Sequence, residues 1–393
     1  MFICDRRMAW RHARIDRMQA PVPPARIAEP ASRILRRVVA CALNVGCLYC
    51  AAAHAGEVVS DVTEAQTSSL LFVPYPITEP AIGTGLLAGP VWMRPGPKDA
   101  SGPSKPQAFG LGALWTDGGS RGWAAFDRRA WGQGRWWSTA IAVDADIRLS
   151  YHGLSPQEDR QLDFVLRLSG ISVEAERRIG DGPSSLGIRP FAGRVDADFG
   201  SSLPTELDPT VSHSRVNGIA LSWARDTRDE LYTPSRGQHL SLGATFYAQA
   251  LGASFGAQSY LLRWTRYGKG VGKGVWGLRA VAEASTGDLP FYLRPYVSLR
   301  GVSAMRYAGE RAASVETEYR WPLGERWDVL AFGGLGTAVS DRRGAKGTKT
   351  VSAGGLGVRF KARKYFGLTF GVDLAQGPDG LVGYVQIGNA WGR

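Results

Sequence analysis

The stretch that decides the fold is Phe366-Gly367-Leu368-Thr369-Phe370-Gly371-Val372-Asp373-Leu374-Ala375. Its even-numbered residues are all large and apolar, whereas the odd-numbered ones are small or polar. Because side chains of a β-strand alternate between two faces, this strand has an apolar face and a polar one. The same alternation recurs in 351–361, in 315–321 and around Arg279. The sequence therefore predicts an all-β protein whose sheet separates two unlike environments.

A soluble β-sandwich and a membrane-spanning β-barrel both show such alternation, but they differ in strand length. The predicted strands are long, whereas sandwich strands average about 5–6 residues; long strands suit a tilted crossing of a membrane. The expected strands are 82–93, 107–116, 120–130, 136–151, 161–177, 186–199, 214–226, 236–250, 254–268, 273–286, 312–321, 327–340, 348–361, 364–375 and 381–391. Bacterial single-chain barrels have an even number of strands, so this odd set lacks one, which we expect within 68–151.

The first part of the chain has the pattern of an export signal. Arg36-Arg37 precedes an apolar run over 38–53, and Ala53-His54-Ala55 supplies a small-x-small cleavage site. The run is short for a membrane helix, which needs about 20 residues. A lipoprotein site at Cys47 or Cys50 is a weaker alternative. The segment before the apolar run is unusually long for a signal peptide, which points to a start further in, at Met18. We assign 1–55 to a cleaved signal peptide with a long basic n-region, 56–80 to a short periplasmic lead-in, and 81–393 to the barrel.

Charge and cysteine content exclude several classes of protein. The chain has 47 Lys and Arg against 35 Asp and Glu, but much of this excess lies in 1–55, so no nucleic-acid partner is expected. All four cysteines lie at or before Cys50, so the exported chain has no thiol chemistry. The histidines beyond the signal, His152, His213 and His239, are scattered, and neither a metal site nor a cofactor is expected.

Two segments carry a family resemblance. The first contains Asp226-Thr227-Arg228-Asp229 and Pro234-Ser235-Arg236-Gly237, and it resembles a strand–turn–strand signature of the BamA/TamA superfamily, the bacterial surface antigen barrels. The second contains Leu299-Arg300-Gly301, followed by Glu316, Glu318 and Arg320, and it resembles the sixth extracellular loop of that superfamily and the acid-bearing strand after it. A weaker likeness lies at Pro76-Ile77 and Gly83-Thr84-Gly85.

The resemblance implies a sixteen-strand transmembrane antiparallel β-barrel whose sixth extracellular loop folds into the lumen. Its loop-lock residues would be Leu299, Arg300, Gly301, Glu316 and Glu318, and its family turn motif would be Asp226, Thr227, Arg228, Asp229, Pro234 and Gly237. We expect Arg300 to pair with Glu318 in preference to Glu316, because Glu316 lies nearer the end of the loop. Gly334 stands where the family often has an aspartate, and the Arg300 pair would take over that role.

The same resemblance implies a role in outer-membrane biogenesis or transport, with a poorly sealed seam between the strands 82–93 and 381–391. Outer-membrane lipids, unfolded barrel substrates or a separate periplasmic protein are the expected partners, in the Gram-negative outer membrane. Members that assemble barrels carry periplasmic POTRA domains, of about 75 residues each, and the residues between Gly56 and the first strand are too few for one. The sequence ends Trp391-Gly392-Arg393, two residues past the terminal aromatic residue that the resemblance leads us to expect.

Two other functions compete with this interpretation. A passive pore would be biased toward anions by Arg279, Arg320, Arg359 and Lys361. A barrel hydrolase needs a Ser/His/acid or paired-acid cluster, which the sequence does not assemble, so no enzymatic activity is expected. Gly252-Ala253-Ser254-Phe255-Gly256 matches a hydrolase pattern but falls in a predicted hairpin loop. Loop length predicts an orientation, with 94–106, 152–160, 200–213, 287–311 and 341–347 outside, and the short connections 116–122, 321–326 and 362–364 inside.

Overall fold

The computed structural model describes residues 69–79, 81–97, 105–151, 162–199, 213–231, 233–341, 346–361 and 369–391. Most of these residues belong to β-strands, and the remainder forms turns, loops and three short 3-10 turns. No helix in the described ranges is long and apolar enough to cross a membrane. The predicted signal peptide, 1–55, and the first part of the predicted lead-in lie outside the described residues.

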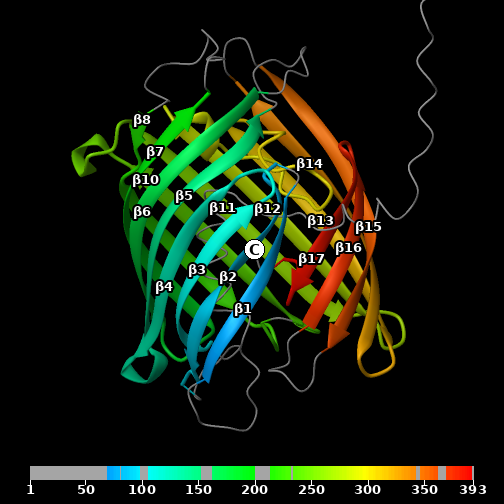
Figure 1. Ribbon diagram of the computed structural model, residues 1–393. Coiled ribbons are helices and arrows are strands. Elements are labelled where there is room, and N and C mark those ends of the chain that lie inside the picture. The colour runs from blue at the N-terminus through cyan, green and yellow to red at the C-terminus, as the bar shows by residue number, and fades with distance from the viewer. Residues whose placement is uncertain are drawn as a thin grey trace, which may run out of the picture. The chain divides into compact units, whose positions relative to one another are not determined.

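Seventeen strands form one antiparallel sheet in which neighbours in sequence are neighbours in space (Figure 1). β8 (His213–Arg215) and β9 (Gly218–Asp226) both pair with β7 (Ser184–Asp198), so together they fill one position in the wall. The sheet is therefore a nearly closed barrel of sixteen strand positions. The other strands are β1 (Ser69–Glu79), β2 (Gly83–Arg94), β3 (Gln107–Thr116), β4 (Arg121–Trp131), β5 (Trp136–Tyr151), β6 (Leu162–Arg178), β10 (Gly237–Tyr247), β11 (Ala257–Lys269), β12 (Val275–Gly287), β13 (Arg311–Leu323), β14 (Trp327–Ser340), β15 (Gly347–Lys361), β16 (Thr369–Gly377) and β17 (Gly380–Ile387).

The alternation that predicted the fold sorts side chains between the outside and the interior of the barrel. On β16, Phe370, Val372 and Leu374 are each exposed by more than 40%, whereas Asp373 between them is fully buried. On β13, Glu316 and Glu318 are likewise buried in the interior. An apolar outer face suits lipid and a polar inner face does not, so the predicted division of faces is confirmed for these strands.

Exposed tryptophans mark the two ends of the apolar outer surface. One group flanks the β4–β5 and β13–β14 connections, which lie at the same end of the barrel; the other flanks the β3–β4 turn at the opposite end. The two groups are Trp131, Trp136, Trp321 and Trp327, and Trp115 and Trp123. Aromatic girdles at both interfaces are typical of transmembrane β-barrels.

The strand missing from the predicted set is β1, which forms an eleven-residue ladder with β2. It lies within 68–151, as expected, but also within 56–80, which we had assigned to the lead-in, so the barrel begins earlier than predicted. Pro74 and Pro76 interrupt its strand pattern, because proline is confined to the edges of sheets. The seam consequently lies between β1 and β17, and not between 82–93 and 381–391.

Connection length separates the connections 288–310 and 324–326 correctly, placing them at opposite ends of the barrel, but it misplaces two others. In an antiparallel barrel, successive connections lie at alternate ends. The short turn 117–120 therefore lies at the same end as the long connection 288–310, and we call this end the loop end. β2 ends and β3 begins at the opposite end, which also carries the short turn 324–326; residues 98–104 between the two strands lie outside the described residues. The predicted placement of 94–106 outside and of 116–122 inside was wrong on this point.

The interior has an apolar half and an ionic half. Near the loop end, Phe291 and Tyr292 of the connection 288–310 pack against Phe164 of β6 and Phe199, with ring centroids 5.3 Å apart for Phe164 and Phe291. Leu166 on β6 also faces this core and is fully buried. The wall of β5 to β7 therefore turns apolar side chains inward, which the expectation of a polar lumen did not include. Charged side chains gather deeper in the barrel, beside β13 and β16.

Candidate functional site

The connection 288–310 between β12 and β13, here called the inner loop, folds back into the barrel as a hairpin. Tyr296 and Ala308 form an isolated antiparallel bridge, and the Val297 N–H donates to the Tyr307 carbonyl at 2.9 Å. The tip turns at Gly301, whose φ is +90°. A side chain there would be strained, and its Cβ would lie only 3.1 Å from the Cβ of Ala353 on β15. The tip can therefore approach the wall this closely only with glycine.

Arg300 at the tip is held by three carboxylates. Its Nε donates to Glu316 Oε1 at 2.9 Å, and its backbone N–H donates to Glu316 Oε2 at 3.1 Å. Its Nη1 donates to Asp373 Oδ2 at 3.0 Å, and its Nη2 lies 2.8 Å from Glu318 Oε2 as an ion pair. The Arg300 side chain is only 7% exposed. We call Arg300, Glu316, Glu318 and Asp373 the Arg300 cluster.

The electrostatics of the cluster favour a permanently charged Arg300. Burial alone would lower the pKa of the Arg300 guanidinium, but the nearby charges of Glu316, Glu318 and Asp373 raise it above its ordinary value. The guanidinium also lies 3.6 Å above the ring of Phe332 on β14, in a cation–π contact. A buried charge is tolerated only when it is paired and hydrogen-bonded, and this arrangement provides both.

The structure brings the predicted loop-lock residues together but changes their order of importance. The expected contact between Arg300 and Glu318 is present, yet Glu316 makes the hydrogen bonds to both the side chain and the backbone of Arg300. The preference for Glu318 was therefore wrong. The reason is depth: Leu299 packs at Gly334, which lies opposite Glu316 in the β13–β14 register, so the tip reaches the level of Glu316.

Asp373 is the site residue that the sequence analysis missed. It bonds to Arg300 and also accepts a hydrogen bond from Arg359 Nη2 at 2.9 Å. An aspartate at position 334 would not fit, because a Cβ on Gly334 would lie 2.6 Å from the backbone carbonyl oxygen of Val315 and 2.8 Å from Leu299 Cδ2. Asp373 supplies the additional carboxylate from β16 instead. The available signal was its position on the inward face of 366–375, the only charged residue in that stretch.

Two further contacts fix the inner loop to the last strands. The Gly301 N–H donates to the hydroxyl of Tyr384 on β17 at 2.7 Å. Ser303 donates from its hydroxyl to Asp379 Oδ2 at 2.7 Å, and Arg306 forms an ion pair with the same carboxylate. Asp379 lies in the turn between β16 and β17. The loop is therefore bonded to the seam side of the wall as well as to β13.

The segment 388–391, which follows β17, turns into the barrel and reaches the Arg300 cluster. The indole N–H of Trp391 donates to Glu316 Oε1, and its ring packs against Tyr267 of β11 with the centroids 5.7 Å apart. Asn389 donates to the Tyr267 hydroxyl. Trp391 is 4% exposed. The position of Trp391 near the end of the sequence is unusual, but no role for it was predicted.

The family turn motif shapes the connection 227–236 between β9 and β10. Arg228 pairs with Asp226, with Nη2 and Oδ2 2.7 Å apart. Asp229 accepts hydrogen bonds from the backbone N–H groups of Ser235 at 2.9 Å and Arg236 at 3.3 Å. Thr227 exchanges backbone and hydroxyl bonds with Gln238. Gly237 has a φ of +93°, and a Cβ there would lie 2.1 Å from the Thr227 carbonyl oxygen.

Arg320 connects this turn to the Arg300 cluster. Its Nη2 donates to the carbonyl of Pro234, a fully buried residue of the turn motif. Its Nε lies 3.8 Å from Glu318 Oε1. The two motifs that carry the family resemblance, far apart in sequence, are therefore joined through one arginine on β13.

The other cations proposed for an anion pore also have partners. Arg279 donates to the carbonyl and hydroxyl oxygens of Ser298 in the inner loop, each at 3.1 Å. Arg359 bonds to Asp373, and Lys361 Nζ lies 2.8 Å from Asp328 Oδ1. Within the described ranges no group of three or more His, Cys, Asp or Glu could hold a metal ion. Ser254 of the hydrolase-like pattern lies in the loop between β10 and β11 and accepts the backbone N–H of Arg215.

No family model matches the sequence, and no curated protein matches it. Several solved structures, in contrast, resemble the structure of this chain. The chain is similar to BamA from Haemophilus ducreyi lacking POTRA domains 1–3, with 12% identity and a TM-score of 0.56 over 90% of this chain and 82% of that one. It is also similar to CdiB from Escherichia coli, with 14% identity and a TM-score of 0.56 over 83% and 63% of the two chains.

The fold is that of the BamA and CdiB barrels. CdiB from Acinetobacter baumannii gives a TM-score of 0.54 at 12% identity, over 82% of this chain and 60% of that one. The chain thus spans about three fifths of each CdiB chain. At such low identity the likeness to BamA and CdiB extends to the fold of an outer-membrane barrel and not to an activity.

Proposed function

We propose that this chain is an outer-membrane barrel of the BamA/TamA type that acts in outer-membrane biogenesis or transport through its seam. The observation that carries the proposal is that β1 and β17 approach each other, yet no hydrogen-bonded register joins them in the described residues (Figure 1). Unpaired backbone groups are costly in lipid, and an open strand edge recruits another strand. The seam would therefore perturb the bilayer locally or accept a strand of an unfolded substrate.

The filled interior supports a route along the seam instead of through the centre. The inner loop occupies the lumen, with an apolar base and the ionic Arg300 cluster at its tip. Through Arg300 the cluster links Glu316 on β13 with Asp373 on β16. The hydrogen bond from Gly301 to Tyr384 also connects the loop tip to β17. A wall stiffened in this way would keep its shape while the junction between β1 and β17 opens.

Outer-membrane lipids, unfolded barrel proteins or a separate periplasmic protein are the proposed partners, and the outer membrane, reached through a cleaved signal peptide, is the proposed location. Depletion of the protein followed by a census of outer-membrane proteins and lipids tests the role. A general loss of barrels supports assembly, and a loss of specific lipids or of one exported protein supports transport. An unchanged census would contradict both.

The seam itself is tested by disulfide crosslinking. Cysteine pairs between β1 and β17 are expected to crosslink slowly or incompletely, because no ladder holds the strands in register. The pair Tyr75→Cys and Leu87→Cys, which are partners in the β1–β2 ladder, is the matched control and should crosslink rapidly. Rapid, quantitative crosslinking along the whole β1–β17 junction would show a sealed barrel and remove the proposed mechanism.

No observation favours the passive anion pore, because the four cations assigned to it are bonded to other groups of the barrel. We expect rare, small current steps in planar bilayers, and large anion-selective steps would support a pore. We also propose that the barrel is not an enzyme, and that the purified protein leaves lipid and peptide substrates unhydrolysed.

A further inference from the structure

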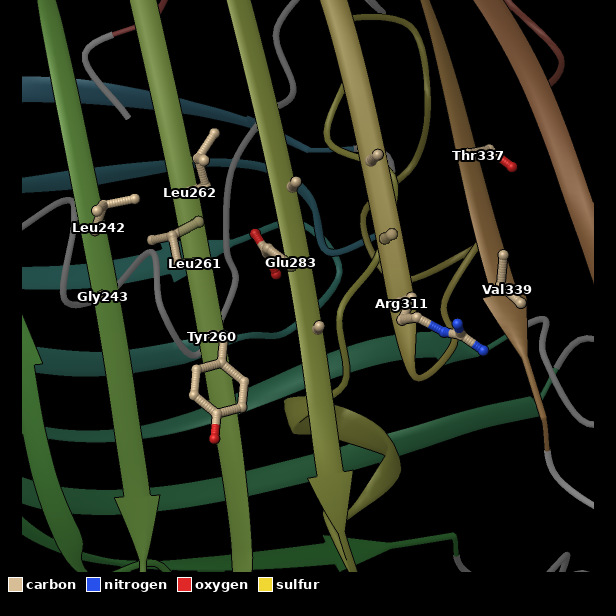
Figure 2. Close-up of a pocket in the computed structure, with 13 residues that line it drawn as sticks. Leu242, Gly243, Tyr260, Leu261, Leu262, Glu283, Arg311, Thr337 and Val339 are labelled. Carbon is tan, nitrogen blue, oxygen red and sulfur yellow. The ribbon is translucent and has the colours of Figure 1, made fainter.

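A hollow in the outer surface of the barrel crosses β10 to β14 (Figure 2). Its floor is formed by three alanines, Ala282 and Ala284 on β12 and Ala313 on β13. Larger side chains on the neighbouring strands form its two walls, with Leu242, Tyr260 and Leu262 on one side and Thr337 and Val339 on the other. Its volume is about 570 Å³, which falls within the range of about 300–1,000 Å³ that is usual for ligand sites.

The alternation along β12 and β13 places the floor of this hollow on the outside of the barrel. Arg279 on β12 is buried in the interior, and Glu283 shares its face of the strand, whereas Ala282 lies on the opposite face. On β13, Ala313 shares its face with Val315, which is 49% exposed. In a membrane, the floor of the hollow therefore faces lipid.

The outward side chains change from apolar to polar along the length of the hollow. Toward the middle of the wall the next outward residues are Val315 and Leu335, which are both exposed and apolar. Toward the loop end they are polar, as at Gln258 and Asp341. Arg311 lies between the two zones, at the end of the hollow nearer the loop end. This is the depth at which the apolar band of a membrane barrel meets the lipid headgroups.

Arg311 supplies the positive charge in the lining of the hollow. It forms an ion pair with Asp341, and both side chains are more than half exposed. An exposed pair of this kind contributes little to stability, so a phosphate that competes with Asp341 has little to displace. A guanidinium binds phosphate through two parallel hydrogen bonds. We propose that the hollow binds a phosphorylated glycolipid of the lipid A class, with one acyl chain on the alanine floor and a phosphate on Arg311.

Position and shape select this lipid over other occupants. The loop end carries the inner loop, which resembles an extracellular loop, so the hollow borders the outer leaflet, whose lipid in Gram-negative bacteria is a phosphorylated glycolipid with saturated chains. A second copy of this chain, related by a two-fold axis through the hollow, would set hollow against hollow and leave both unfilled. The inference rests on the proposed outer-membrane location, and it adds a lipid site that β15 to β17 separate from the seam.

Binding of purified lipid A to the purified protein in detergent, measured by native mass spectrometry, tests the proposal. Arg311→Ala removes the phosphate partner, and we expect the affinity to fall about tenfold, whereas Arg311→Lys should retain most of it. Ala282→Leu combined with Ala313→Leu fills the floor and should lower the affinity to a similar extent. Asp341→Asn removes the competing carboxylate and should raise the affinity. Dephosphorylated lipid A should bind weakly, and its binding should not depend on Arg311.

Two matched controls lie outside the hollow. Arg121 is an exposed arginine at the loop end of β4 that pairs with Asp146, and Ala113 is an exposed, outward-facing alanine on β3. Arg121→Ala and Ala113→Leu should both leave lipid A binding unchanged. Binding that survives Arg311→Ala and the filled floor, equally tight binding of phosphatidylglycerol, or a dimer that the filled floor abolishes would each overturn the proposal. Those results leave the seam untouched, and a sealed seam in the crosslinking experiment would remove the seam mechanism while the lipid site stands.

Discussion

The inner loop and the turn 227–236 both bend into the barrel and both depend on charged side chains, but their surroundings differ. Arg300 is 7% exposed and has three carboxylate partners. Asp229 in the turn is 20% exposed, and its cationic neighbour Arg236, 3.9 Å away, is 81% exposed. Water competes with the ionic contacts of the exposed turn, but it is largely excluded from those of the buried loop tip. The same kinds of bond should therefore contribute far more to stability at the tip than at the turn.

The largest effect is expected from Arg300→Ala, which leaves three buried carboxylates without their shared cation. Removing one partner of a buried ion pair costs about 3–5 kcal/mol. We expect the heat-stability of the barrel on gels to fall and surface proteases to cleave within 288–310. Arg236→Ala, at the exposed turn, is the matched control and should cost less than about 1 kcal/mol. If Arg300→Ala leaves both readouts unchanged, the loop is not held inside by this cluster.

A second comparison separates the two glutamates of the cluster. Glu316→Ala removes the acceptor for Arg300 Nε, for the Arg300 backbone N–H and for the Trp391 indole N–H. Glu318→Ala removes an ion-pair contact with Arg300 and a longer one with Arg320. We expect a loss of about 3 kcal/mol for the first and about 1 kcal/mol for the second. In cycles with Arg300→Ala, coupling should be larger for Glu316, and the opposite order would restore our original preference for Glu318.

The difference between predicted and observed partners shows what periodicity can supply. Alternation places Glu316, Glu318 and Asp373 on the inward face, because the period of a strand depends only on local sequence. It does not say how deep a loop descends, which depends on contacts such as Leu299 against Gly334. It also cannot align β16 with β13, since they are not neighbours and their relation depends on the registers of three successive strand pairs.

Two other features lay beyond pattern recognition for different reasons. β1 was missed because Pro74 and Pro76 weaken the strand signal, although an edge strand at a seam is where such prolines are allowed. The inward turn of 388–391 was missed because no local pattern distinguishes an aromatic residue that faces lipid from one that packs on Tyr267 inside. Both depend on where the barrel closes, which is a property of the whole sheet.

A moderate effect is expected from Trp391→Phe, which keeps an aromatic ring near Tyr267 but removes the donor to Glu316. Loss of a hydrogen bond to a charged group costs about 1.5–3 kcal/mol. Heat-stability on gels should fall by less than with Arg300→Ala, and cleavage within 288–310 should increase. Trp391→Ala should cost more than Trp391→Phe, because it also removes the packing against Tyr267. Equal stability of Trp391→Phe and the unsubstituted protein would mean that 388–391 does not support the cluster.

The smallest effect concerns the charge of Asp229. Burial alone would raise the pKa of this carboxyl, but hydrogen bonds from the Ser235 hydroxyl and from the backbone of Ser235 and Arg236 hold it below its ordinary value. A carboxylate with a lowered pKa in the folded state stabilises the fold above its unfolded pKa of about 3.9, and this contribution is lost as the pH falls through the folded pKa. Asp229→Asn removes the charge and keeps an acceptor oxygen. We expect the unsubstituted protein to be more stable by less than about 1 kcal/mol at neutral pH, with a difference that begins to shrink below about pH 4. Thermal unfolding of both proteins across this range measures it, and a difference that stays constant there would show that the turn does not depend on the Asp229 charge.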